Sequence, residues 1–194
     1  MNITPEQTNE LIRKRRSIFP KMYINKPISK EILEEILENA NWAPTHRLTE
    51  PWRFVVFQSE SALNELGAFL AKAYQKRTPK ERFSEAKYQK NLKKPSQCGA
   101  VLAICMNRDE AESIPEIEEI CSVSCAVQNI LLSASAYNIG AYWSSPSTVF
   151  SDEMKDYLNL GAKDKCLGLV YMGYHKMPEI AGKRTPMSDK VKWR

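Results

Sequence analysis

A chain of 194 residues, of which 43% are hydrophobic, can bury one sizeable core without disulfides or a structural metal, so we expect a single domain over residues 1–194. No apolar run approaches the roughly 20 residues that cross a bilayer, and the N-terminus lacks a basic segment followed by an apolar one, which favours a cytoplasmic protein without a membrane span. The net charge of +5 suits an anionic small ligand as well as nucleic acid, and the five cysteines with only two histidines argue against a zinc site.

Two capped helices and a strand are predicted in the first third of the chain. Thr4-Pro5-Glu6-Gln7 has the pattern of a capping box with proline at the first helical position, and this helix runs into the basic residues 13–16. Ser29 opens a second helix, which Pro44 ends. The apolar run PWRFVVFQ, residues 51–58, predicts a central strand buried on both faces.

The middle of the chain predicts helices on either side of a second strand. Apolar residues at helical spacing in 63–73 predict a helix, and Thr78 is expected to cap a charged helix that ends near Pro95. The run GAVLAICMN, residues 99–107, predicts a buried strand. Residues 115–138 predict a long helix that finishes at Gly140, and its small side chains permit close approach of a second helix, including one from another subunit.

The last third predicts a short strand around residues 141–147, a capped helix over 151–161 and a final core strand over 165–175. Helices and strands do not alternate strictly, and the chain has no G-x-G-x-x-G or P-loop motif. The predicted class is therefore α+β or a mixed α/β sheet.

Arg15, Arg16 and Ser17 follow the first helix and combine two planar guanidinium groups with a hydroxyl, a set that suits a phosphate dianion. Cations at a helix C-terminus also complement the helix dipole, a contribution of about 0.3–1 kcal/mol. On the tripeptide alone, this structural explanation is favoured over a phosphate site. A second polar stretch, residues 44–49, joins a helix to a buried strand, which is a common place for binding residues.

Four motifs together resemble the nitroreductase family of flavin enzymes. They are Arg-Arg-Ser at 15–17, Ala-Pro-x-His with Pro-Trp-Arg-Phe over 43–54, Trp-Ser-Ser at 143–145 and LGLVYMGY over 167–174, in the order of the family. The resemblance implies an α+β sandwich around a mostly antiparallel sheet flanked by helices. It also implies FMN as cofactor, NADH or NADPH as electron donor, and a homodimer with FMN at the subunit interface.

The same resemblance implies roles for individual residues, with no catalytic side chain because FMN carries the chemistry. Arg15, Arg16 and Ser17 would hold the phosphate and ribityl chain, and Lys183 or Arg184 would return to that phosphate. The loop with Trp42, Pro44, Thr45 and His46 would reach the flavin of the other subunit, and Trp143, Ser144 and Ser145 would lie along its ring. This chain departs from the family with Phe19 and Pro20 after the serine, so Lys21 is a candidate for the basic contact to the ring. It also has Glu50 in place of a frequent glutamine, and the negative charge would retune that contact.

The implied function is transfer of electrons from NAD(P)H through flavin N5 to an electron-poor acceptor such as a nitroaromatic or a quinone, with ping-pong kinetics. One alternative is a flavin-binding protein without reductase turnover, which stores or consumes flavin. A basic nucleic-acid-binding module is a distant third, because the aromatic residues lie in apolar strands and are not interleaved with the basic ones. We expect neither a nucleic-acid nor a membrane partner.

Overall fold

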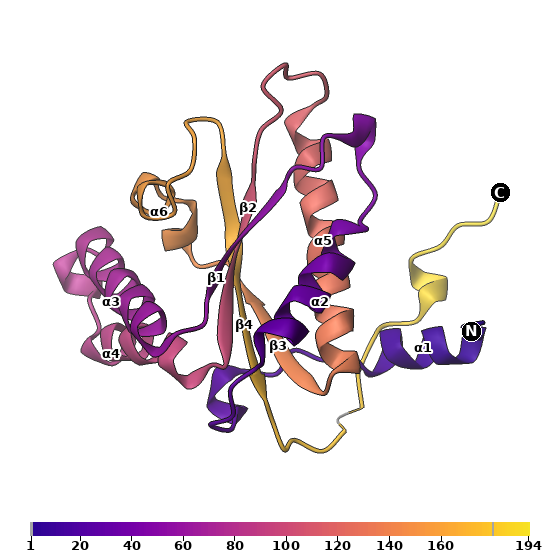
Figure 1. The fold of residues 1–194 in the computed structure, drawn as a ribbon, viewed down its shortest axis with the longest axis horizontal. Coiled ribbons are helices and arrows are strands. Elements are labelled where there is room, and N and C mark those ends of the chain that lie inside the picture. The colour runs from indigo at the N-terminus through magenta and orange to yellow at the C-terminus, as the bar shows by residue number, and fades with distance from the viewer. Residues whose placement is uncertain (1, 180) are drawn as a thin grey trace.

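A four-stranded antiparallel sheet organises the chain, which a computed structural model describes at residues 2–179 and 181–194. The strand order is β1-β2-β4-β3, with β1 at Trp52–Phe57, β2 at Ala100–Met106, β3 at Ile139–Ser144 and β4 at Lys165–Tyr174. Helices α2 (Lys30–Asn41) and α5 (Glu116–Ala136) cover one face, and α3 (Glu60–Arg77), α4 (Glu85–Lys93) and α6 (Asp152–Tyr157) lie on the other (Figure 1). The predicted α+β class with an antiparallel sheet is confirmed.

The core lies on both faces of the two central strands. All seven residues of β2 are buried, and their side chains alternate between the two faces. Leu102 and Ile104 belong to the cluster beneath α2 and α5, whereas Val101 and Ala103 belong to the cluster beneath α3 and α6. The continuous apolar run of β2 is therefore explained by burial on two sides.

Strand β1 corrects the prediction of a central strand. Within the part of the chain that the structure describes, it pairs only with β2 and forms an edge of the sheet, where Val56 is 39% exposed. The apolar residues of β1 still pack at its two ends, since Trp52 and Phe57 are buried. An apolar run reports the burial of side chains and not the presence of a second neighbouring strand.

Side-chain caps fix the starts of α1, α2 and α6 where the sequence predicts them. Thr4 and Gln7 form the reciprocal capping box of α1 (Pro5–Lys14), with N···O distances of 3.3 and 3.0 Å, and Ser29 caps α2. The charged helix is shorter than predicted, because α4 starts after its own cap at Ser84, while Thr78 ends α3. The long helix ends at Ala136, and Gly140 lies in β3 and not at the helix end.

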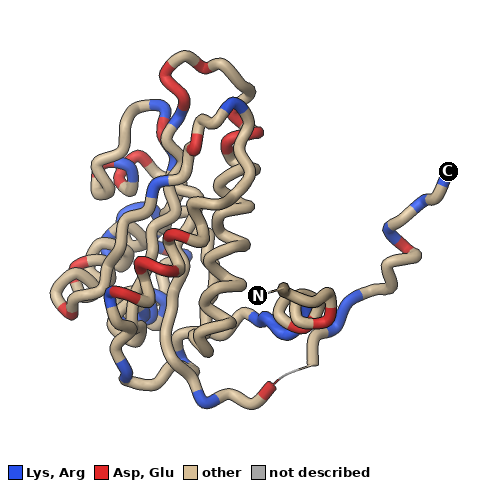
Figure 2. Tube along the Cα trace, turned by 45° about the vertical axis from the view of Figure 1, so that its right-hand side comes forward, with Lys and Arg blue, Asp and Glu red and all other residues tan. Residues whose placement is uncertain are grey.

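Helix α1 and the C-terminal tail stand away from the body of the molecule (Figures 1 and 2). No residue of α1 is buried, and every residue from 181 to 194 is exposed. Apolar side chains are among them, since Ile12 is 50% exposed and Trp193 is 91% exposed. These two segments make few core contacts within one chain.

Among the described residues, α5 is the one helix that is long and apolar enough to cross a membrane, judged by its length and composition only. It is 21 residues long, and its buried side chains pack on the sheet and on α2. Glu119 near its start is fully buried and accepts hydrogen bonds from the Arg108 guanidinium and from the backbone N–H of Asp109. In this fold α5 is therefore the core helix.

The five cysteines divide into three buried and two exposed thiols. Cys98, Cys105 and Cys166 are buried, whereas Cys121 and Cys125 are exposed, one turn apart on α5.

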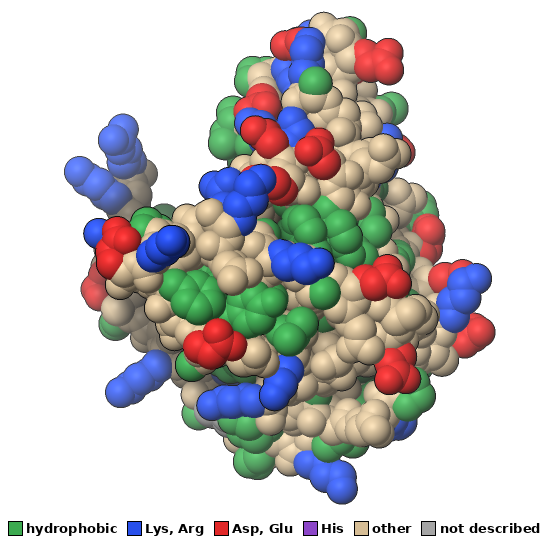
Figure 3. Space-filling view, turned by 90° about the vertical axis from the view of Figure 1, so that its left-hand side faces the viewer, with side chains coloured by type: hydrophobic (Ala, Val, Ile, Leu, Met, Phe, Trp, Pro, Cys, Tyr) green, Lys and Arg blue, Asp and Glu red, His purple; other side chains and the backbone are tan. Residues whose placement is uncertain are grey.

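The opposite side of the molecule, covered by α3, α4 and α6, shows lysine and arginine side chains beside exposed hydrophobic ones (Figure 3).

Candidate functional site

The basic residues at the end of α1 lead the chain to the edge of the sheet at β3. Arg15 caps α1, with its N–H donating to the Leu11 carbonyl at 3.2 Å. Ser17 then forms a parallel bridge with Ala141 of β3, and the next N–H, of Ile18, donates to the Ala141 carbonyl at 3.2 Å. The Arg-Arg-Ser stretch is thus anchored to β3.

The C-terminal tail returns to the same place. Gly182 packs so tightly against the Arg16 guanidinium that a β-carbon at this position would overlap it. Burial lowers the pKa of Arg15, and the charges of Arg16 and Arg184 lower it further. Three guanidinium groups from the two ends of the chain therefore gather in one region, where Figure 2 shows the cationic parts of α1 and the tail close together.

This cluster suits a multiply charged anion. Gathered like charges repel one another, and a phosphate group relieves that repulsion while accepting charge-assisted hydrogen bonds. In the tail, the charge of Arg184 acts on Arg15. The residues present therefore fit the phosphate of FMN, and they favour Arg184 among the two candidates in the tail.

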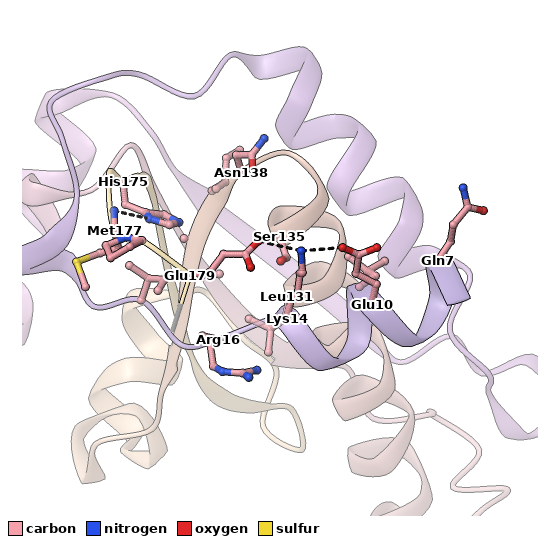
Figure 4. Close-up of a pocket in the computed structure, with 16 residues that line it drawn as sticks. Gln7, Glu10, Lys14, Arg16, Leu131, Ser135, Asn138, His175, Met177 and Glu179 are labelled. Atoms are coloured by element: carbon pink, nitrogen blue, oxygen red, sulfur yellow. Dashed lines mark hydrogen bonds and ion pairs between the residues drawn. The ribbon is translucent and has the colours of Figure 1, made fainter. Parts of the chain in front are cut away.

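A cavity of about 410 Å³ lies beside this cluster, between α1, the C-terminal half of α5 and the start of the tail (Figure 4). Lys14 crosses it and forms ion pairs with Glu10 at 2.7 Å and Glu179 at 2.9 Å, which raise its pKa. Lys14 therefore connects α1 to the tail through these two carboxylates.

The loop after α2 lies at the other end of α5. Trp42 is 79% exposed and donates from Nε1 to Glu38 at 2.9 Å, Pro44 is exposed, and Thr45 Oγ1 accepts the N–H of Glu50 at 3.2 Å. His46 Nδ1 lies 2.5 Å from Glu118 Oε2, in the first turns of α5. The cavity beside Arg16 instead meets α5 at Leu131 and Ser135.

These two regions are separated by most of the length of a helix. At a rise of about 1.5 Å per residue, 118 and 135 lie roughly 25 Å apart along α5. One small ligand at Arg15 and Arg16 cannot also meet His46 of the same chain. Any shared ligand would need the loop of a second subunit, which is the arrangement that the family resemblance implies.

The three residues at the end of β3 do not share one surface. Trp143 packs with the core beneath α2 and α5, Ser144 turns toward α4, and Ser145 is exposed beyond the strand. Successive strand residues point to opposite faces, so Trp143 and Ser144 cannot line the same wall. The Trp143 Nε1 is buried, has no hydrogen-bond partner within the described residues and packs against Gly168.

Lys94 is a candidate that the sequence analysis missed. Its Nζ lies 3.5 Å from Ser144 Oγ and 3.8 Å from the centroid of the Tyr171 ring, and burial lowers its pKa to about 8. In the sequence it belongs to KNLKKP, which reads as a solvated basic helix end. The one available signal is its position directly before Pro95, where the chain leaves α4 for β2.

Lys21 lies near Lys94 and Ser144, whereas Glu50 does not. Lys21 lines a cavity with Phe19, Lys94 and Tyr142, so it can serve the region next to Ser144. Glu50 is exposed in the loop after α2 and has a positive φ of 41°. Within one chain, Glu50 therefore lies in the same loop as His46 and not beside Lys94.

The comparisons with known proteins agree with this fold. The family model "Nitroreductase family" matches residues 12–174. A Bacillus subtilis protein named "Putative NAD(P)H nitroreductase YfhC" is 29% identical over 186 residues, with 93% of this chain and 91% of that protein covered. The chain belongs to the nitroreductase family, as its motifs predicted.

Solved structures show the same fold at lower sequence identity. A nitroreductase-like family protein from Bacillus cereus is 22% identical, with a TM-score of 0.81 over 100% of this chain and 99% of that chain. A structure described as "a putative nitroreductase in complex with FMN", from Exiguobacterium sibiricum, is 20% identical, with a TM-score of 0.73 and full coverage of both chains. The predicted nitroreductase-like fold is confirmed.

Proposed function

We propose that this protein binds FMN and transfers electrons from NADH or NADPH to an electron-poor acceptor such as a nitroaromatic or a quinone. The observation that carries the proposal is the gathering of Arg15, Arg16 and Arg184 from the two ends of the chain. The names of the relatives support it, since the B. subtilis protein is named for NAD(P)H and the E. sibiricum structure contains FMN.

Each part of the chain has a distinct task in this proposal. Arg15, Arg16 and Arg184 bind the phosphate, with Ser17 held beside them by its bridge to β3. Lys94, oriented by Ser144 and the Tyr171 ring, presents a positive charge toward the flavin ring. When bound, FMN accepts a hydride at N5 from the nicotinamide and delivers electrons to the acceptor.

The overall reaction balances without a protein acid or nucleophile. A nitro group becomes a nitroso group and water by taking the hydride of NAD(P)H and one proton, which solvent supplies. The protein binds, orients and shields the reactants from water. We therefore assign no side chain to proton transfer.

We further propose that the active form is a homodimer. Several exposed apolar side chains lie on α1, on the tail, at Trp42 and Leu48 of the loop, and at Ile117 of α5, and a second copy would cover them. The roughly 25 Å between the loop and the arginine cluster supports the same conclusion, because the loop residues can meet a flavin only across a subunit interface.

Release of flavin from the purified protein tests the proposal first. We expect a yellow protein that releases FMN on denaturation. Without oxygen, NADH or NADPH should bleach its flavin absorbance, and a nitroaromatic should then restore that absorbance. A colourless protein that binds no added FMN would overturn the cofactor assignment. A yellow protein that neither pyridine nucleotide bleaches would favour flavin storage or consumption instead.

A further inference from the structure

Two neighbouring cavities open beside Lys94 on the α3 and α4 side of the sheet. One, of about 510 Å³, reaches from Phe19 and Lys21 to α4, and the other, of about 520 Å³, reaches from α4 to Tyr74 and the loop after β3. They share Ala86, Lys90, Lys94 and Tyr142 in their linings. Together they form one recess, which we call the α4 recess, next to the Ser144 position.

The lining of the α4 recess is cationic. Five lysines contribute to it, and no aspartate or glutamate lines either cavity; the lysines are Lys21, Lys87, Lys90, Lys93 and Lys94. Within residues 2–179 and 181–194, none of the five forms an ion pair. Lys90 also lowers the pKa of Lys94 by its charge. The positive charge of the recess is therefore not neutralised by these parts of the chain.

Aromatic side chains form much of the remaining lining. Phe19 packs against Tyr142 with ring centroids 4.6 Å apart, and Tyr142 packs against Tyr171 at 6.3 Å. Lys87 lies over the Tyr74 ring, 4.9 Å from its centroid. Flat apolar walls with a few polar groups are suited to a planar aromatic ligand.

We propose that the α4 recess selects planar aromatic acceptors that carry a negative charge, such as a carboxylate or a sulfonate, through Lys87 and Lys90 of α4. The inference rests on the proposed function, because it makes the recess beside Ser144 the entrance for the acceptor. Lys87 and Lys90 lie one turn apart on the same side of α4, so one anionic substituent can meet both. Because Lys87 and Lys90 are exposed, each contact is modest and sensitive to salt.

Calorimetric binding to the oxidised, FMN-loaded protein without any pyridine nucleotide tests the selectivity apart from turnover. The ligands are 4-nitrobenzoate and the neutral, similarly shaped 4-nitrobenzamide. We expect the benzoate to bind at least about fivefold more tightly at low salt, and the preference to shrink as the Debye length falls from about 30 Å at 0.01 M to about 8 Å at 0.15 M salt.

The double variant Lys87→Gln with Lys90→Gln should abolish the preference and leave the affinity for the benzamide unchanged. Lys72→Gln on α3 is the matched control, since Lys72 is exposed and lines neither cavity, and it should retain the preference. Equal binding of the two ligands, or a preference that survives the double variant, would overturn the inference.

Turnover separates this inference from the proposed function. Reduction of both nitro compounds with similar kcat/KM supports the proposed function and overturns the charge selectivity. Selective binding of the benzoate without reduction of either compound supports the anion site and overturns the proposed function. A loss of affinity confined to NADPH in the double variant, with unchanged benzoate binding, would assign the lysines to the donor and so overturn the inference.

Discussion

The side-chain nitrogen of Lys94, directly after α4, lies 3.8 Å from the centroid of the Tyr171 ring of β4. Burial lowers the pKa of Lys94 from its ordinary value of 10.5 to about 8, and the charge of Lys90 lowers it as well. The amine therefore loses its proton as the pH rises through about 8. Below that pH the charged form is present, and a charged amine attracts the carbonyl oxygens of a bound flavin ring more strongly than a neutral amine does.

We predict that the affinity of the apoprotein for FMN falls as the pH rises from about 7 to 9.5, and that Lys94→Gln flattens this dependence. Quenching of flavin fluorescence during titration measures it. Lys80→Gln, at an exposed residue of the turn before α4, is the control and should keep the slope. A pH profile that is identical in the wild type and in Lys94→Gln would remove Lys94 from the site.

The arginine cluster predicts a contrast between neighbours in the tail. Arg15→Ala and Arg184→Ala should each lower FMN affinity about ten- to hundredfold, the effect of losing a charge-assisted hydrogen bond of about 1.5–3 kcal/mol. Lys183→Ala should change it little, because the charge of Arg184 is the one that acts on Arg15. If Lys183→Ala weakened binding and Arg184→Ala did not, the phosphate ligand in the tail would be Lys183.

The proposed dimer predicts that the same substitution at two equally exposed residues has different effects on assembly and on FMN binding. Ile117 on α5 and Phe150 beside α6 are both 61% exposed, on opposite sides of the sheet. Ile117→Glu should give a monomer by sedimentation that retains little FMN, since an unpaired charge would lie in the proposed interface. Phe150→Glu should remain a dimer with its flavin. A monomeric wild type that binds FMN tightly would contradict the interface.

Local signals in the sequence predicted most helices and strands, because caps and periodicity act over a few residues. The caps at Thr4, Ser29 and Ser151 were all predictable. The edge position of β1 was not, since it depends on which strands pair across the sheet. The strand order is set by contacts between distant segments.

The same distinction applies to the candidate site. Two adjacent guanidinium groups and a hydroxyl made Arg15, Arg16 and Ser17 visible as phosphate ligands in the sequence alone. Lys94 was hidden, because its position over the rings of Tyr142 and Tyr171 depends on β3 and β4, and its burial lowers its pKa. The opposite directions of Trp143 and Ser144 follow from the β3 register, which a motif of three letters does not reveal.

Gly168 permits the packing of Trp143 and predicts a costly substitution. Its φ is +145°, which L side chains rarely adopt, and a β-carbon there would overlap the Trp143 indole and lie 2.9 Å from the Ser144 carbonyl oxygen. Gly168→Ala should lower the free energy of unfolding by about 2–5 kcal/mol, from backbone strain and overpacking together. Urea denaturation with an unchanged m value measures this loss.

Gly161→Ala is the matched control for that substitution, because Gly161 lacks a positive φ and a β-carbon there would meet only the carboxylate end of Asp164, at 2.9 Å. It should cost less than about 1 kcal/mol.

Trp143→Phe combined with Gly168→Ala separates the two causes, since the smaller ring relieves the overlap and leaves the backbone strain. Because Trp143 precedes Ser144 in β3, the single variant Gly168→Ala should also weaken FMN binding, and the double variant should restore part of it. Unfolding of Gly168→Ala within about 0.5 kcal/mol of the wild type would show that β3 and β4 move apart at little cost, and that Trp143 does not fix the position of Ser144.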